Sequence, residues 1–378
     1  MKCAIVTVFY NTNYGAVLQA YALSKTIEKL TNSECYLIDY RREKIRNMFR
    51  FSLFDVGMDD KIRITFDSLK RTVKQCINPK GTIIRFKKFE DFRKEHMSIS
   101  DEVYYKREQI NFKDINILFL GSDQIWNPDI TQGFDDVYFG KINNSSIFTV
   151  SYAASLGKTI FSDAELFELK QLINYVDIIS VREEEGAEVI RQLTDREIIC
   201  VPDPTVLVDR KSWLKIAAGT KKIKKKYIMV YMLEYSQVLV DLAYQMSEKY
   251  KCEIILFDSG LSKPIKRMKQ KKACGPNEFI RYLADAEFVI TNSFHGTVFS
   301  VIFHKQFYTI PHKTKGSRMI NFCNKLDLDN RIIDESRNIN SIEIEKQIDY
   351  SLIQLKLDEL KQVGFDFIKG ALKEIDYE

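Results

Sequence analysis

Short apolar runs alternate with amphipathic stretches along most of this chain, in the order typical of an α/β fold. The first apolar run, residues 3–10, is rich in β-branched and aromatic side chains, which indicates a strand buried on both faces of a parallel sheet. A polar turn at 11–15 follows, then a helical pattern at 16–30 and a second strand at 34–40. These segments predict a βαβ unit with a right-handed crossover.

The alternation then forms two successive series. Residues 1–208 predict an N-terminal Rossmann-like domain, interrupted at about 41–110 by a charged and aromatic stretch that we expect to be a helical insertion. Residues 209–345 repeat the β and α alternation and predict a second Rossmann-like domain. Residues 346–378 predict a long helix that packs back across both domains. The expected fold is therefore two Rossmann-like domains facing a cleft, which is a GT-B-like architecture.

Composition and charge narrow the classes of function. The chain has 378 residues, of which 45% are hydrophobic, and this is ordinary for a folded soluble protein. Its net charge of +5 is mild for its length, so we expect no nucleic-acid partner. Basic residues cluster at 221–227 and 263–272, where they are either a solvated face or a contact for anionic lipid headgroups or diphosphates.

Cysteine usage and hydropathy indicate the compartment. The seven cysteines are odd in number and form no C-x-x-C pair, so neither a disulfide framework nor a zinc site is expected. No run approaches the ~20 apolar residues that span a bilayer. We expect a cytoplasmic protein, either free or peripheral at the inner face of the plasma membrane.

The polar loop after the expected strand at 115–120 is a candidate site. Gly121 permits close backbone approach, Ser122, Asp123 and Gln124 offer donors and acceptors suited to a polyol, and Trp126 offers a stacking surface. The alternative is an Asx turn and helix cap built on Ser122 and Asp123, with Trp126 in the core. The position at a strand end favours the first interpretation.

Two further strand ends carry residues suited to an anion and a proton. Arg182 stands beside a helix N-terminus, where it either grips a carboxylate or phosphate or pairs with a nearby glutamate. His295 lies between Ser293 and Gly296 at another helix N-terminus, where it either transfers protons near neutral pH or caps and packs. The strand-end setting favours a functional role for His295.

A third group follows the last expected strand. Lys315, Ser317 and Arg318 near Gly316 form a candidate phosphate grip, although no P-loop is present. The chain also has no G-x-G-x-x-G, G-x-S-x-G or H-E-x-x-H motif, so nucleotide-cofactor oxidoreductases, serine hydrolases and zincins lose support.

Six motifs in order now resemble the polysaccharide pyruvyl transferase family, from about residue 3 to about residue 330. They read NTNYGAVLQAYAL, GSDQIWNP, SYAASLG, SVREEEGAEVI, PDPT and TNSFHGTVFSVIF. The resemblance implies a GT-B-like fold and an enzyme that uses phosphoenolpyruvate to place a pyruvate ketal on a sugar of a cell-surface glycan. It also implies an acceptor that is often lipid-linked, here a polyprenyl-diphosphate-linked sugar. No metal-ligand spacing appears, so the expected enzyme is metal-independent and needs no cofactor besides its donor substrate.

The resemblance also implies roles for individual residues. Arg182 corresponds to the arginine that holds the donor, and His295 corresponds to the histidine implicated in catalysis. Family members often have Arg-Leu before that histidine, whereas this chain has Ser293 and Phe294, so Arg318 or a lysine is the expected substitute. The acid is His295 or a nearby carboxylic acid, and the base is Asp123 or His295.

The remaining motif residues at these strand ends are expected to contact donor or acceptor: Asn11, Asn13, Tyr14, Gly15, Tyr152, Ser155, Gly296 and Thr297. Two other functions stay open. One is a GT-B-like glycosyltransferase that uses a nucleotide sugar, because fold alone does not choose the chemistry. The other is a catalytically inactive member that binds glycan. The acceptor sugar, the ketal stereochemistry and the oligomeric state are open as well.

Overall fold

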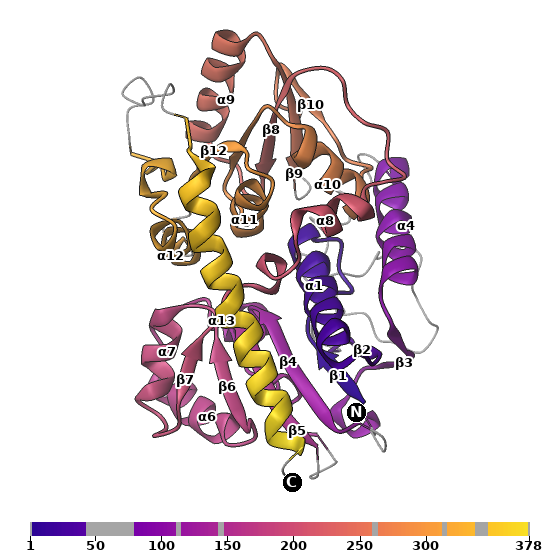
Figure 1. The fold of residues 1–378 in the computed structure, drawn as a ribbon, viewed down its shortest axis with the longest axis vertical. Helices are drawn as coiled ribbons and strands as arrows, with labels where there is room; N and C mark the ends of the chain where they lie inside the picture. The colour runs from indigo at the N-terminus through magenta and orange to yellow at the C-terminus, as the bar shows by residue number, and fades with distance from the viewer. Residues whose placement is uncertain are drawn as a thin grey trace.

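A computed structural model describes residues 2–42, 79–110, 115–142, 147–258, 264–311, 316–336 and 347–376. In this described part the chain forms two parallel β-sheets with helices around them (Figure 1). The expected α/β fold with two Rossmann-like sheets is confirmed. The boundary near residue 208 stays a prediction; it falls between the last strand of the first sheet and the first strand of the second.

The first sheet has seven strands among the described residues, in the order β3, β2, β1, β4, β5, β6, β7. All neighbouring pairs are parallel. The strands are β1 Cys3–Val6, β2 Cys35–Tyr40, β3 Ile99–Tyr104, β4 Ile117–Asp123, β5 Phe148–Ala154, β6 Ile178–Val181 and β7 Ile198–Cys200. The chain runs outward from β1 to β3 and then returns to the other side of β1, so the switch point lies between β1 and β4.

The second sheet has five parallel strands within the described ranges, in the order β10, β9, β8, β11, β12. They are β8 Tyr227–Met232, β9 Glu253–Asp258, β10 Met268–Gln270, β11 Phe288–Thr291 and β12 Gln306–Thr309. Its switch point lies between β8 and β11. In both sheets the central strands are fully buried, which explains their continuous apolar runs.

Helices connect the strands and cover the sheets (Figure 1). The longer ones are α1 Tyr14–Thr31, α4 Pro79–His96, α6 Asp163–Ile173, α7 Glu184–Arg191, α9 Gln237–Tyr250, α10 Pro276–Asp285, α11 Phe294–Ile302, α12 Ser317–Lys325 and α13 Tyr350–Asp376. Shorter ones are α5 Pro128–Thr131, α8 Arg210–Ile216, η1 Arg107–Gln109, η2 Asp136–Phe139, η3 Pro204–Val206 and η4 Asp329–Arg331.

The expected helical insertion at about 41–110 needs a partial correction. Residues 79–96 are helical, but residues 99–104 form β3, an edge strand that pairs with β2. Its sequence ISDEVY has an exposed, charged middle, because an edge strand buries little of its surface. Residues 43–78 lie outside the described residues.

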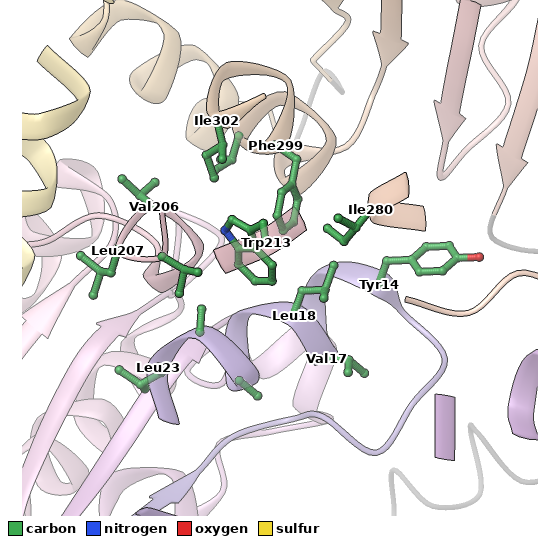
Figure 2. Packing of buried hydrophobic residues seen from close by; sticks show 14 of the residues in the cluster. Tyr14, Val17, Leu18, Leu23, Val206, Leu207, Trp213, Ile280, Phe299 and Ile302 are labelled. Carbon is green, nitrogen blue, oxygen red and sulfur yellow. The ribbon is translucent and has the colours of Figure 1, made fainter. Parts of the chain in front are cut away.

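One hydrophobic cluster joins the two sheets. Trp213 of α8 is fully buried and packs edge-on against Phe299 of α11, with ring centroids 4.9 Å apart. Figure 2 shows Leu18 of α1 and Ile302 of α11 in the same cluster, so helices from both halves of the chain meet there. The two sheets are therefore held by a shared apolar core.

Tyr14 adds a polar link between the halves. Its hydroxyl donates to the carbonyl oxygen of Cys274 at 2.8 Å, and its ring stacks on that of Phe279 with centroids 4.4 Å apart. The long helix α13 runs across both sheets (Figure 1). At its start Tyr350 donates to the carbonyl oxygen of Ser300 of α11, and near its end Phe367 lies by Tyr152 of β5. The expected crossing helix is confirmed.

Candidate active site

Arg182 is the centre of a buried polar cluster at the carboxyl ends of neighbouring strands. It follows β6, and its side chain is only 3% exposed. Nη2 donates to Oγ of Ser122 at 2.7 Å and lies 3.2 Å from Oδ2 of Asp203. Ser122 is the next-to-last residue of β4 and Asp203 follows β7, so the parallel register brings these side chains to one edge of the sheet.

Asp123 lies at the same edge in a left-handed backbone conformation. Its φ is +69°, which few non-glycine residues adopt, and its carbonyl oxygen accepts from the amides of Ile125 and Ser155. Oδ1 is 3.8 Å from Nη1 of Arg182 and 3.8 Å from Nη1 of Arg318. Both distances exceed a hydrogen bond, so the carboxylate lies near both guanidinium groups without engaging their N–H groups.

His295 enters the cluster from the second sheet. It stands in the first turn of α11, whose N-cap is Ser293, with Oγ accepting from the amide of Gly296 at 3.3 Å. The imidazole is 7% exposed, and Nε2 lies 3.4 Å from Oδ2 of Asp203. The histidine and the buried aspartate therefore face each other across the two halves of the chain.

Phe294 lies between two arginines. The guanidinium carbon of Arg182 is 5.2 Å from its ring centroid, and that of Arg318 is 5.6 Å from the same centroid. Both distances are within the range of cation–π attraction. Arg318 comes from the first turn of α12, so one aromatic ring gathers cations from two parts of the fold. Burial lowers the pKa of Arg318, with the neighbouring Arg182 acting in the same direction.

Glu183 is a second buried carboxyl group in the cluster. Oε1 accepts from Oγ of Ser155 at 2.9 Å and lies 4.0 Å from Nε of Arg318. Burial raises the pKa of Glu183, and the attraction of Arg182 and Arg318 offsets only part of that shift. From the sequence, a glutamate near Arg182 is expected only as an ion-pair partner, and Glu183 is not singled out.

Gln124 supports the arginine of α12. Its side-chain amide lies between Asn127 and Arg318, and with its oxygen towards the guanidinium it accepts from Nη1 at 3.0 Å. The polar loop GSDQ thus brings Ser122, Asp123 and Gln124 to the arginine pair.

Other expected site residues are placed in the core. Trp126 is fully buried, donates from Nε1 to the carbonyl oxygen of Tyr138 at 2.7 Å and stacks on Phe139, which favours the alternative of a core residue. Tyr152 is fully buried against α13. Thr297 is fully buried and bonds within α11 and to Thr309. A Cβ at Gly121 would lie against Leu23 of α1, so this glycine serves helix packing.

Of the polar turn at residues 11–15, Gly15 is the residue that contacts the cluster. Asn13 caps α1 by accepting from the amides of Gly15 and Ala16, and Asn11 accepts from the amide of Asn13. Gly15 lies directly against the imidazole of His295. Gly296 packs against Thr291 and Tyr231, and Ser317 is exposed at the start of α12. Lys315 lies outside the described residues.

Asp203 was missed as a site residue. The motif PDPT that contains it was recognised, but nothing local distinguishes this aspartate from a turn-forming residue. Its role depends on residues 182 and 295, which are far away in sequence. It could have been identified only by predicting that the carboxyl ends of β6 and β7 lie next to the loop that follows β11.

Neither basic run is part of the cluster. Lys225 and Lys226 precede β8 and form exposed ion pairs with Glu253 and Glu287, and Arg267 pairs with Glu248. Within the described ranges no helix is long and apolar enough to cross a bilayer. Over the same residues no group of three or more histidine, cysteine or acidic side chains could hold a metal ion.

Two doubly wound parallel sheets, with charged groups from both meeting between them, define a protein of GT-B-like architecture. A model of the polysaccharide pyruvyl transferase family matches residues 13–314, and the chain belongs to this family. None of the curated proteins matches the chain.

Solved structures share the fold at low sequence identity. A UDP-N-acetylglucosamine 2-epimerase from Rickettsia bellii matches with a TM-score of 0.51 and 11% identity, over 100% of this chain and 97% of that chain. The epimerase from Methanocaldococcus jannaschii matches with a TM-score of 0.46 and 13% identity, over 96% and 92%. E. coli heptosyltransferase WaaC with ADP matches with a TM-score of 0.41 and 9% identity, over 96% and 99%. The likeness to the Rickettsia enzyme concerns the fold alone.

Proposed function

We propose that this chain is a pyruvyltransferase. It moves the pyruvate moiety of phosphoenolpyruvate onto a sugar of a cell-surface polysaccharide or its lipid-linked precursor, forms a cyclic ketal and releases phosphate. Family membership supports the reaction class. The observation that carries the proposal is that buried Arg182 and mostly buried Arg318 converge on Phe294 beside His295.

The arginine pair suits a donor with two anionic groups. Phosphoenolpyruvate carries a carboxylate and a phosphate, and guanidinium groups bind both in a fork-like geometry. Among the described residues Nε and Nη1 of Arg182 find no hydrogen-bond partner although both atoms are buried. Leaving a buried donor unsatisfied costs about 1–3 kcal/mol, so an anion bound there would remove that cost.

Arg318 can also replace the arginine that family members often have two positions before the histidine. Ser293 takes the place where relatives often have arginine, and here it caps α11 instead. Arg318 approaches the same ring from α12, so it supplies the second cation from another element. Phe294, where relatives often have leucine, provides the surface on which both cations rest.

The chemistry we propose begins with protonation of the methylene carbon of phosphoenolpyruvate. His295 or the buried acid Glu183 is the donor of that proton, because burial raises the pKa of Glu183 and favours its protonated form. A sugar hydroxyl then adds to carbon two and gives its proton to a base, for which Asp123 and His295 are the candidates. The bond between carbon two and the phosphate oxygen breaks, and a neighbouring hydroxyl closes the ketal with loss of its proton. The arginine pair stabilises the charge on the departing phosphate.

The test is calorimetric binding of phosphoenolpyruvate to wild type, Arg182→Ala and Arg318→Ala, followed by phosphate release with a panel of sugar acceptors. We expect binding to wild type and a loss of about 10-fold or more in affinity for either variant, since hydrogen bonds to charged groups contribute about 1.5–3 kcal/mol. Arg191→Ala is the matched control, because Arg191 is an exposed arginine at the end of α7 that pairs with Glu184. Wild type that neither binds phosphoenolpyruvate nor releases phosphate would refute the proposal.

The same protein samples separate the two other functions. A nucleotide sugar that raises Tm, with no effect of phosphoenolpyruvate, would favour the glycosyltransferase. Binding of glycan acceptors without any phosphate release would favour a catalytically inactive member. The absence of a metal requirement is tested by assaying phosphate release with and without a chelator.

A further inference from the structure

Among the described residues, Asp203 is the charged group that lies within ion-pair distance of both Arg182 and His295. It is 2% exposed and stands at the start of η3, just after β7. Oδ2 lies 3.2 Å from Nη2 of Arg182 and 3.4 Å from Nε2 of His295. Both are ion-pair contacts, since neither Oδ2 nor Nε2 of His295 makes a hydrogen bond of good geometry within the described part of the chain. The first partner belongs to the first sheet and the second to the helix after β11, so this oxygen lies where the two halves meet.

The two carboxylate oxygens of Asp203 contact different partners. Oδ1 accepts from the amide of Thr205 at 2.9 Å and from Oγ1 of Thr205 at 2.6 Å. These bonds cap η3 and fix the direction of the carboxylate. With Oδ1 bound in this way, Oδ2 lies on the side of the arginine and the histidine.

The surroundings keep this carboxylate ionised. Burial alone would raise the pKa of Asp203, but the guanidinium of Arg182 and the imidazole of His295 outweigh it, and the pKa lies below its ordinary value. A buried carboxylate beside an imidazole nitrogen sets which ring nitrogen carries the proton.

We propose that Asp203 is a positioning residue: its Oδ2 holds Nη2 of Arg182 and Nε2 of His295 in register across the two halves of the chain. The remaining N–H groups of Arg182 then face the donor phosphate, and the imidazole of His295 is held beside them with Nε2 towards Asp203. This inference deepens the proposed pyruvyl transfer and rests on it for its catalytic consequence.

Asp203→Asn tests the proposal with little change of shape. The amide oxygen keeps the bonds from Thr205, while an NH₂ group replaces the charged oxygen that faces Arg182 and His295. We expect kcat for phosphate release to fall by about 100-fold or more, because small misplacements of catalytic groups have effects of that size. KM for phosphoenolpyruvate should change much less than kcat, and Tm should stay within a few degrees of wild type.

Glu185→Gln is the matched control. Oε2 of Glu185 accepts from Nδ2 of Asn321 at 2.6 Å, so it is another carboxylate that joins α7 to α12, through a residue outside the cluster. We expect its kcat to stay within about threefold of wild type, as for a surface substitution. An Asp203→Asn enzyme with a kcat as close to wild type as this control would overturn the proposal.

A second readout does not depend on the reaction. Nitrogen-15 spectra of the histidine rings, with the signals of residue 295 identified through His295→Gln, report which nitrogen carries the proton. We expect the Nε2–H form in wild type and a loss of that preference in Asp203→Asn. If wild type releases no phosphate, the proposed function fails while this spectrum still tests the contact. A wild-type histidine protonated only on Nδ1 overturns the inference, even if Asp203→Asn does not fold.

Discussion

The backbone of Gly15 lies directly against the imidazole of His295. A Cβ added to Gly15 would be 2.5 Å from Cγ and 2.7 Å from Cε1 of the ring, and closer still to Nδ1. Gly15 belongs to the first turn of α1 and His295 to the first turn of α11, so two helix N-termini from different sheets meet at this contact. Only glycine leaves room for the histidine in this arrangement.

We therefore expect Gly15→Ala to displace His295 or to separate the two halves locally. A displacement of about 1 Å at a catalytic group lowers activity by roughly 100-fold, and the loss should appear mainly in kcat. Gly219→Ala is the control, because nothing lies within 4 Å of a Cβ at Gly219. Steady-state phosphate release from both variants is the measurement. Equal activities would show that His295 has no role that depends on this contact.

Phe294 is predicted to set the spacing of the arginine pair. Phe294→Leu removes the aromatic face on which Arg182 and Arg318 rest, while a leucine keeps most of the apolar volume. Each cation–π contact is worth about 0.5–2 kcal/mol, so we expect affinity for phosphoenolpyruvate to fall by several-fold to about 30-fold. Phe294→Tyr keeps the ring and should bind nearly as wild type does. Calorimetry on the three proteins checks this, and equal affinity of all three would contradict it.

The interior of both sheets could be predicted from the apolar pattern, but their edges could not. The runs at β1, β4, β8 and β11 are buried on both faces, and such runs are continuous in sequence. Strand β3, with the sequence ISDEVY, is an edge strand with exposed charges. Strand β10, with the sequence MKQ, is short and also at an edge. Neither of them shows the pattern of a buried strand, so a prediction from periodicity misses both.

The candidate site was predictable as far as it depends on strand ends. Asp123 is the last residue of β4, Arg182 and His295 each follow a strand, and the parallel topology brings them to one place. The local sequence pattern does not show in which direction a side chain points once the strand has ended. Trp126 follows the same strand as Asp123 but turns into the core, and Asp203 lies in a turn yet points into the site.

Glu183 should give the stability of the protein a distinct pH dependence. Burial raises its pKa in the folded state above the ordinary value of 4.5. A group with a raised folded pKa contributes stability that is fully present below the unfolded value and is lost as pH rises through the folded value. The free energy of unfolding of wild type relative to Glu183→Gln should therefore fall as pH rises above about 4.5.

Urea unfolding of both proteins at several pH values between 4 and 8 measures this difference. Ser155 can still donate to the amide oxygen of a glutamine, so the substitution keeps the local hydrogen bond. Glu188→Gln, at an exposed position on the same helix, controls for the loss of one carboxylate. A difference between wild type and Glu183→Gln that does not change with pH would show that folding leaves the pKa of Glu183 unshifted, and would contradict this prediction.

The second basic run offers a test of membrane contact. Arg267 and Lys269 are about half exposed or more and pair with Glu248 and Glu253 at the surface, and such pairs contribute little. Each basic residue near an anionic surface is worth about 1 kcal/mol. Neutralising Lys266, Arg267, Lys269, Lys271 and Lys272 together should lower sedimentation with anionic vesicles at low salt and leave sedimentation with neutral vesicles unchanged. Unaltered sedimentation with anionic vesicles would rule out contact through this run.

The packing of α13 against the first sheet requires a small residue at position 364. A Cβ at Gly364 would lie 2.6 Å from the hydroxyl oxygen of Tyr152 and 2.7 Å from Cδ2 of Leu207, both of which are buried. Gly364→Ala should therefore push the helix away and destabilise the protein by about 1–3 kcal/mol, the usual cost of overpacking. Gly370→Ala, on the same helix with nothing within 4 Å of its Cβ, should instead stabilise by up to about 1 kcal/mol through helix propensity. Urea unfolding of the two variants beside wild type measures both effects. Through Tyr350, α13 also contacts α11, which carries His295. If Gly364→Ala lowers the unfolding free energy but leaves phosphate release unchanged, α13 stabilises the fold without determining the geometry of the site.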